Sequence, residues 1–154
     1  MIKLQDILNE GVYDPGIFKA VFMAGGPGSG KGYTAKTLLG MPETMPFVSA
    51  SGLKGVNSDS AYEAYLKVAG MSADMTKMSP EQFAKSQELR TKAKRVVAKK
   101  MISFINAKLG LLIDGTAKDY KKIANLFKQL KDQGYDCYMV FVNTDLDVAL
   151  ANNM

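Results

Sequence analysis

Hydrophobic and polar residues fall into blocks along this chain, and glycine, proline or small polar residues separate the blocks. Short apolar runs predict buried strands, because strands covered on both faces are nearly continuously hydrophobic. These runs cover residues 17–24, 53–58, 111–114 and 135–142. Apolar residues at helical spacing predict helices at 2–10, 33–39, 60–69, 79–109 and 119–133, with another beginning at 144. Strands that alternate with helices predict a three-layer α/β/α fold with a mostly parallel sheet.

Particular residues predict where two of these helices begin and end. Ser79 and Gln82 form a capping box around Pro80, which suits the first position of a helix. Gly110 is expected to end that helix. Thr144 and Asp147 have capping-box spacing at the start of the last helix, although this segment could instead touch a ligand.

The stretch Gly25-Gly26-Pro27-Gly28-Ser29-Gly30-Lys31 lies between the predicted strand at 17–24 and the next helix. It fits the pattern G-x-x-x-x-G-K in the strand–turn–helix context that predicts a phosphate-binding loop. Glycines allow several backbone N–H groups to surround an anion, and the helix N-terminus adds partial positive charge. Lys31 would reach the terminal phosphates. The predicted binding residues are Gly26, Pro27, Gly28, Ser29, Gly30, Lys31, Gly32 and Tyr33.

The position after the lysine is Gly32, where the general pattern has a serine or threonine that contacts Mg²⁺. A metal ion would therefore depend on water, phosphate oxygens and a carboxylate elsewhere, which suits Mg²⁺. Asp114 directly follows the apolar run at 111–113, so we predict that it holds Mg²⁺ or its water shell. The alternative for Asp114 is a turn favoured by the Asp-Gly pair.

Asp59 ends the second predicted strand, and it could accept or position the proton of an acceptor hydroxyl. Alternatively, Asp59 or Ser60 caps the helix at 60–69. Ligands of parallel sheets bind beyond the carboxyl ends of the strands. The loop, Asp59, Asp114 and the segment Asn143–Asp145 all fall there, so we expect one site.

Composition narrows the chemistry further. The 154 residues suit a single domain, 1–154, and no membrane span or signal peptide is visible. There is no histidine, so a catalytic base would have to be a carboxylate or lysine. The one cysteine, Cys137, lies in an apolar run, which predicts a core thiol and a cytoplasmic protein. The net charge of +5 and the basic stretch at 85–100 leave a polyanion or nucleic acid open as a partner, unless that stretch is simply a solvated helix face.

The loop up to Gly32 resembles that of adenylate and UMP/CMP kinases, which also have glycine after the lysine. Three other features look closer to zeta-toxin-like and polynucleotide-kinase-like P-loop kinases, including phage-type members: Val56-Asn57-Ser58-Asp59, the long helix and Val142-Asn143-Thr144. For a phage-type member, the compartment would be the host cytoplasm. The resemblance implies binding of ATP and Mg²⁺ and transfer of a phosphoryl group to an unidentified hydroxyl or phosphate. It makes Lys31 the ligand of the β- and γ-phosphates and Asp59 the acceptor-side carboxylate.

Kinases of this group continue into an arginine-bearing lid, a final strand and a helix, whereas this chain ends at Met154. We therefore expect the lid and the last strand to be missing because the chain is truncated at its C-terminus. Alternatively, a partner in an oligomer supplies the lid. The alternatives to a kinase are a nucleotide-binding module without catalysis, an NTP-hydrolysing protein, and a polynucleotide-binding protein. Hydrolysis is disfavoured because Gly115, and not a glutamate that could activate water, follows Asp114.

Overall fold

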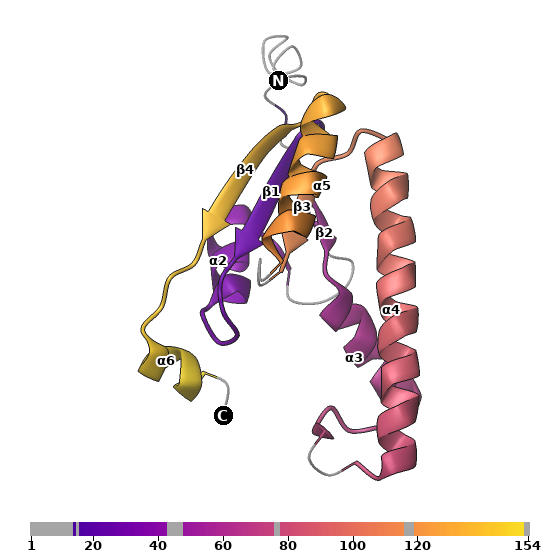
Figure 1. Ribbon diagram of the computed structural model, residues 1–154. Coiled ribbons are helices and arrows are strands. Elements are labelled where there is room, and N and C mark those ends of the chain that lie inside the picture. Colours follow the sequence, from indigo (N-terminus) through magenta and orange to yellow (C-terminus); the bar gives the residue numbers. More distant parts are fainter. Residues whose placement is uncertain (1–13, 15, 43–47, 76–77, 116–118, 153–154) are drawn as a thin grey trace, which may run out of the picture. The chain divides into compact units, whose positions relative to one another are not determined.

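The chain divides into two units in this computed structural model, which describes residues 14, 16–42, 48–75, 78–115 and 119–152 (Figure 1). The sheet unit comprises residues up to 55 and from 104 onward, and the helical unit comprises residues 56–103. The predicted helix at 2–10 lies outside the described residues. No helix in the described ranges is both long enough and apolar enough to cross a membrane.

The sheet has four strands in the order β2-β3-β1-β4. Their bounds are β1 (Lys19–Ala24), β2 (Lys54–Val56), β3 (Leu111–Asp114) and β4 (Asp136–Phe141). The central strand β1 pairs in parallel with β3 and with β4, so that Val21 lies opposite Leu112 on one side and Tyr138 on the other. These pairings confirm the predicted α/β class with a parallel sheet.

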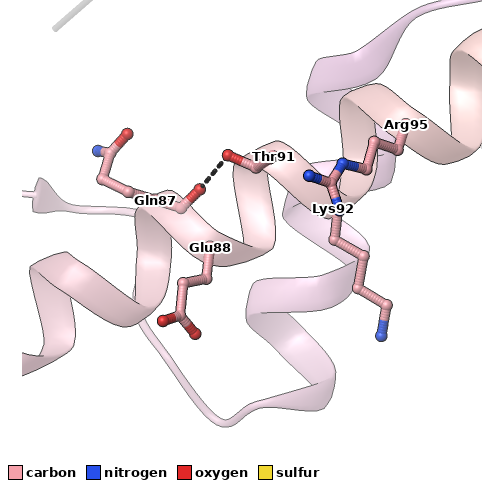
Figure 2. Close-up of a pocket in the computed structure, with 5 residues that line it drawn as sticks. All are labelled: Gln87, Glu88, Thr91, Lys92 and Arg95. Carbon is pink, nitrogen blue, oxygen red and sulfur yellow. Dashed lines mark hydrogen bonds between the residues drawn. The ribbon is translucent and has the colours of Figure 1, made fainter.

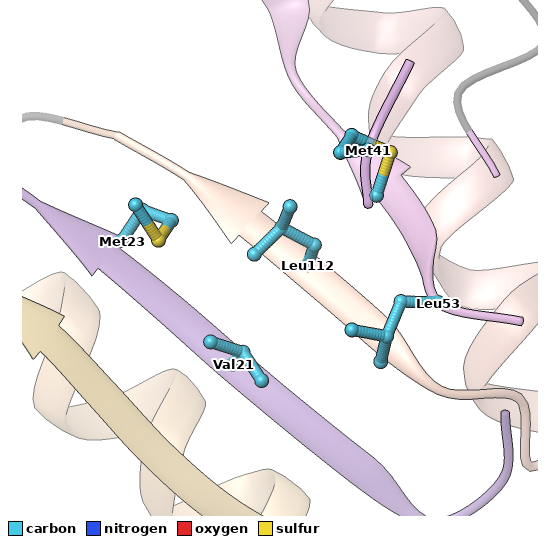
Figure 3. Packing of buried hydrophobic residues seen from close by; sticks show 5 residues of the cluster. All are labelled: Val21, Met23, Met41, Leu53 and Leu112. Carbon is cyan, nitrogen blue, oxygen red and sulfur yellow. The ribbon is translucent and has the colours of Figure 1, made fainter. Parts of the chain in front are cut away.

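Helices cover both faces of the sheet because successive side chains of a strand point to opposite sides. In the sheet unit these helices are α2 (Lys31–Leu39) and α5 (Tyr120–Asp132), whereas α6 (Leu146–Ala151) follows β4 beyond the end of the sheet (Figure 1). Val21 and Met23 pack with Met41, Leu53 and Leu112 on one face, next to Ala35 and Leu39 (Figure 3). Phe22 faces the opposite side and meets Phe127 of α5 with ring centroids 5.5 Å apart. This alternation produces the predicted three layers.

The strand β4 is less buried than its apolar sequence suggests. It lies at the end of the strand order, and Tyr138, Met139 and Phe141 are each more than half exposed. Cys137 is only half-buried and is therefore not the core thiol that the apolar run predicts. The reason is that the described sheet pairs β4 on one side only.

The helical unit packs α3 (Ser58–Val68) against α4 (Pro80–Asn106), whose last turn belongs to the sheet unit. Its core is small, with Tyr62 and Leu66 from α3 against Ala93 from α4. The predicted capping box at the start of α4 is confirmed, because the N–H of Gln82 donates to Ser79 Oγ at 3.2 Å and the N–H of Ser79 donates to Gln82 Oε1 at 3.0 Å.

The end of α4 differs from the prediction. The helix stops at Asn106, and Lys108 adopts the left-handed conformation with φ 56°. The N–H of Leu109 then bonds to the carbonyl of Phe104 at 3.0 Å, which is the hydrogen bond that closes a Schellman-type end. Gly110 is therefore not the terminator. It lies beyond the helix, where its N–H donates to the carbonyl of Gly16 at 2.6 Å.

Candidate functional site

The glycine-rich stretch forms a tight turn between β1 and α2. Gly28 and Gly30 have φ values of 68° and 87°, in the left-handed region that glycine enters without steric cost. The N–H of Ser29 bonds to the carbonyl of Gly26 at 3.3 Å and closes the turn. The sequence therefore folds here as a glycine-rich turn between strand and helix, with α2 beginning at Lys31.

Gly25 is the most crowded position of the loop. A Cβ atom at this residue would lie 2.6 Å from Ser29 Oγ and 2.7 Å from the carbonyl oxygen of Val142. By contrast, a Cβ at Gly26, Gly30 or Gly32 would meet no other atom within 4 Å. The loop is thus packed against the sheet at Gly25, whereas Gly26 and Gly30 have open space beside them.

Lys31 extends back over the start of the loop. Its ammonium group donates hydrogen bonds to the carbonyl oxygens of Gly25 at 2.9 Å and Gly26 at 2.8 Å. An ammonium has three N–H donors, so these two bonds hold the charge at the loop and leave one donor for a ligand.

The N-terminus of α2 completes an environment suited to an anion. The first N–H groups of a helix have no partner within the helix, and the first turn of α2 contains no acidic side chain. The hydroxyl of Ser29 is buried and has no hydrogen-bond partner among the described residues. Tyr33 is 75% exposed. Backbone donors, one hydroxyl and one ammonium are therefore gathered around the loop, and this donor set fits a polyphosphate.

Two side chains from the segment after β4 fix the outer side of the loop. Thr144 Oγ1 donates to the carbonyl of Ser29 at 2.7 Å, and Asn152 Nδ2 donates to the carbonyl of Gly28 at 2.9 Å. The predicted cap role of Thr144 is wrong, since α6 begins at Leu146 with Asp145 in the N-cap position. The sequence gives no local signal for these contacts, because they join residues more than one hundred positions apart.

Asp114 lies beside the loop. It is the last residue of β3 and pairs with Met23 of β1, two residues before Gly25. Thr34 of α2 donates its hydroxyl to the carbonyl of Gly30 at 3.0 Å, which leaves its oxygen as an acceptor. Asp114 is therefore the carboxylate that the sheet places next to the loop.

The metal-binding capacity of this region is limited. The described residues contain no group of three or more histidine, cysteine, aspartate or glutamate side chains that could hold a metal ion alone. A single carboxylate next to this loop still fits Mg²⁺ bound together with a polyphosphate, because Mg²⁺ retains several waters and shares phosphate oxygens. The donor set is therefore suited to a metal that arrives with a nucleotide.

Asp59 belongs to the helical unit, so its position is defined within that unit alone. It is exposed in the first turn of α3, and its N–H donates to Asn57 Oδ1 at 2.7 Å. Asn57 is thus the N-cap, and neither Asp59 nor Ser60 has that role, because α3 begins two residues earlier than predicted. A carboxylate in the first turn also interacts favourably with the helix dipole.

Comparison with known proteins identifies the family. The family model described as zeta toxin matches residues 14–152. Among curated proteins, none matches this chain. The match extends over nearly all of the chain and includes the loop, Asp59 and Asp114. It confirms the predicted resemblance to zeta-toxin-like P-loop kinases.

Solved structures show the same fold. A candidate kinase from Chloroflexus aurantiacus has a TM-score of 0.57 and 14% identity, with 88% of this chain and 64% of that chain covered. A structure from the PezAT toxin–antitoxin system of Streptococcus pneumoniae has a TM-score of 0.57 and 18% identity, with 88% and 51% covered. A chain of the Pnkp1/Rnl/Hen1 complex has a TM-score of 0.55 and 14% identity, with 90% and 40% covered.

This chain therefore spans between two fifths and two thirds of the length of these structures. At such identities the likeness establishes the fold, namely that of P-loop kinases. The family model matches far more than half of the sequence, and this match assigns the chain to a family. The chain belongs to the zeta toxin family.

Proposed function

We propose that this chain is an ATP- and Mg²⁺-dependent phosphotransferase that acts on a hydroxyl or phosphate group of a small molecule, nucleotide or polynucleotide. The observation that carries this proposal is the loop at 25–31. It has an ammonium group at its start and a helix N-terminus at its end, and Asp114 lies on the adjacent strand.

In this proposal the loop binds the triphosphate. The backbone N–H groups at the start of α2 and the Ser29 hydroxyl donate hydrogen bonds to the phosphate oxygens. Lys31 uses its third N–H donor for the terminal phosphates while the carbonyls of Gly25 and Gly26 keep the ammonium in place. These positive and partially positive groups would stabilise the charge of the transferring phosphoryl group.

Asp114 would hold Mg²⁺ through water or directly, and the chemistry that the bound ion would supply is neutralisation of phosphate charge. Asp59 would accept the proton of the acceptor. As the acceptor oxygen forms its bond to the γ-phosphorus, the bond from that phosphorus to the bridging oxygen breaks, ADP leaves, and the hydroxyl proton passes to the Asp59 carboxylate. The support for Asp59 is its exposed position in the first turn of α3, three residues after the last residue of β2.

Titration calorimetry with ATP and Mg²⁺ tests the binding part. We expect Lys31→Ala to weaken binding by at least 10-fold, which is about 1.4 kcal/mol. Lys128→Ala, which removes an exposed lysine from α5, is the matched control and should bind like the wild type. Equal binding by wild type and Lys31→Ala would rule out the loop as the nucleotide site.

Transfer of labelled phosphate from ATP to nucleosides, nucleotides, sugar nucleotides and 5′-hydroxyl oligonucleotides tests the chemistry. For the acceptor that reacts, we expect Asp59→Asn to lower kcat by about 10²–10⁴-fold, as for loss of a general base. Glu63→Gln removes another exposed carboxylate of α3 and should have no effect. ATP binding without transfer to any acceptor would favour a nucleotide-binding module instead.

A further inference from the structure

The positive charge of this protein is concentrated on one helix. α4 contains seven basic residues against Glu81 and Glu88, a net charge of +5 that equals the net charge of the whole chain. Both arginines of the sequence, Arg90 and Arg95, are on this helix. The remaining residues therefore balance to zero, and long-range attraction of an anionic partner would be directed to α4.

Four of these cations share one side of the helix. They stand at intervals of seven, three and four residues, which places them within one face of a helix that turns every 3.6 residues. All four side chains are exposed, and we call them the basic stripe: Lys85, Lys92, Arg95 and Lys99. At 1.5 Å per residue the stripe is about 21 Å long.

Arg90 has a different environment. Its guanidinium carbon lies 4.7 Å from the ring centroid of Tyr62, which is buried in the core of the helical unit. This cation–π contact makes Arg90 a packing residue. Lys92 also lies near an aromatic ring, 4.9 Å from the centroid of Tyr65, yet it remains exposed. Lys92 of the stripe therefore contacts α3, whereas its side chain stays exposed to solvent.

Acidic side chains do not neutralise the stripe. Across the described ranges of the chain, the only ion pair joins Lys19 to Asp136, far from α4 in the sequence. Glu88 is the one acid within the stripe, and it makes no ion pair with Lys92 although both point to the same side of the helix (Figure 2). The stripe therefore keeps its charge available for a partner.

A hollow of about 550 Å³ lies on this part of α4. Its lining combines two cations of the stripe with an amide, a hydroxyl and the one acid, and consists of Gln87, Glu88, Thr91, Lys92 and Arg95 (Figure 2). Thr91 donates its hydroxyl to the carbonyl of Gln87 at 2.9 Å, so its oxygen is left as an acceptor. These groups offer hydrogen bonds beside the positive charge.

We propose that the basic stripe binds single-stranded nucleic acid. A line of exposed cations along one helix face suits the repeating negative charge of a phosphodiester backbone, and a flexible strand can adjust to the uneven spacing of the cations. The amide of Gln87 and the hydroxyl of Thr91 can hydrogen-bond to base edges, which a single strand leaves accessible. This binding is independent of the proposed nucleotide site, since none of the residues involved belongs to the loop.

Fluorescence anisotropy with a labelled 12-nucleotide single-stranded DNA, titrated from 50 to 200 mM NaCl, tests the proposal. Four phosphate contacts predict a slope of log K against log salt of about −2.8, because each contact to a single strand contributes about −0.7. Lys92→Ala/Arg95→Ala should halve the slope. At 0.1 M salt it should weaken binding about 25-fold, since each contact then contributes about 5-fold.

Two further variants keep the test specific. Lys121→Ala/Lys122→Ala removes the same charge from exposed positions of α5 and should leave the slope unchanged. Glu88→Gln removes the acid that lies among the cations of the stripe. It should strengthen binding about 2- to 5-fold, because one phosphate contact contributes about 5-fold in affinity. Far-UV circular dichroism checks that each variant is folded.

The proposal is overturned if the wild type binds the DNA without salt dependence or if both double variants lose affinity equally. It is also overturned if polyglutamate of similar length, or vesicles containing anionic lipid, compete as well as unlabelled DNA. Lys31→Ala should bind the DNA like the wild type. Retained DNA binding by this variant therefore separates the stripe from the proposed ATP site, and either proposal can fail alone.

Discussion

The hydroxyl of Thr144 donates a hydrogen bond of 2.7 Å to the backbone carbonyl of Ser29, a residue 115 positions earlier in the chain. This bond connects the segment after β4 to the middle of the glycine-rich loop. Together with the bond from Asn152 to Gly28, it holds two loop carbonyls on the outer side. Peptide groups are planar, so fixing a carbonyl also fixes the direction of the next N–H.

We therefore expect Thr144→Val to weaken ATP binding about 10-fold and to cost about 1–2 kcal/mol of stability, because a part-buried carbonyl loses its donor. Thr144→Ser keeps the hydroxyl and should restore binding to within about 3-fold of the wild type. Calorimetry gives the affinities and urea unfolding gives the stabilities. Wild-type affinity in Thr144→Val would show that the loop does not need this contact.

Gly25→Ala should be strongly destabilising, by about 2–4 kcal/mol, because the new Cβ would overlap Ser29 Oγ and the Val142 carbonyl. Gly26→Ala is the control at the neighbouring position, where a Cβ meets nothing within 4 Å. It should cost less than about 1 kcal/mol. Urea midpoints compare the two, and equal midpoints would contradict the crowding at Gly25.

The capping box should contribute measurably to the helical unit. We expect Ser79→Ala to cost about 1 kcal/mol of unfolding free energy, since the N–H of Gln82 loses its acceptor. Gln82→Ala removes the reciprocal bond. A double-mutant cycle measures the coupling, which should be favourable by a few tenths of a kcal/mol or more, as in pairs that share a cap. Strictly additive effects would show that the two bonds act independently.

Stability should fall at alkaline pH because of Tyr135 and Cys137. Burial raises the pKa of Tyr135, and the neighbouring Cys137 raises it further. Burial also raises the pKa of Cys137. Lys131 lowers the Cys137 pKa by a smaller amount, and Asp136 raises it. The Tyr135 hydroxyl also donates to the carbonyl of Leu109 at 3.1 Å, a bond that only the neutral phenol can make.

A raised pKa in the folded state means that the unfolded chain loses these protons first. The stabilisation is complete below the ordinary pKa values of 9.0 for cysteine and 10.0 for tyrosine, and it is lost as the pH rises through the raised values. We expect Tm to decrease above about pH 9. Tyr135→Phe and Cys137→Ala should each flatten this decrease, and unchanged profiles in both variants would exclude these groups as its cause.

Features that depend on local sequence could be predicted well. The apolar runs gave β1 and β3, the glycine spacing gave the loop at 25–31, and Ser79 with Gln82 gave the start of α4, because each signal lies within a few residues of the feature that it specifies. The parallel sheet also followed from the alternation of strands and helices. The family resemblance rested on the same local motifs.

Features that depend on tertiary contacts could not be predicted. Thr144 has the sequence of a cap, but its hydroxyl bonds to Ser29 because β1 and β4 are neighbours in the sheet. Lys108 ends α4 although Gly110 is available two residues later, because Gly110 bonds to Gly16 instead. Cys137 has an apolar sequence context, yet its exposure is set by the position of β4 in the strand order.

That strand order also has a consequence for synthesis on the ribosome. β1 is synthesised before both strands that pair with it. Roughly 90 more residues are added after Val21 before its partner Leu112 is made, and Tyr138 is made later still. At about 5–20 residues per second, this most buried strand stays without a partner for at least several seconds. The nascent chain would therefore expose Ala20–Ala24 to chaperones before the loop at 25–31 can be held in place.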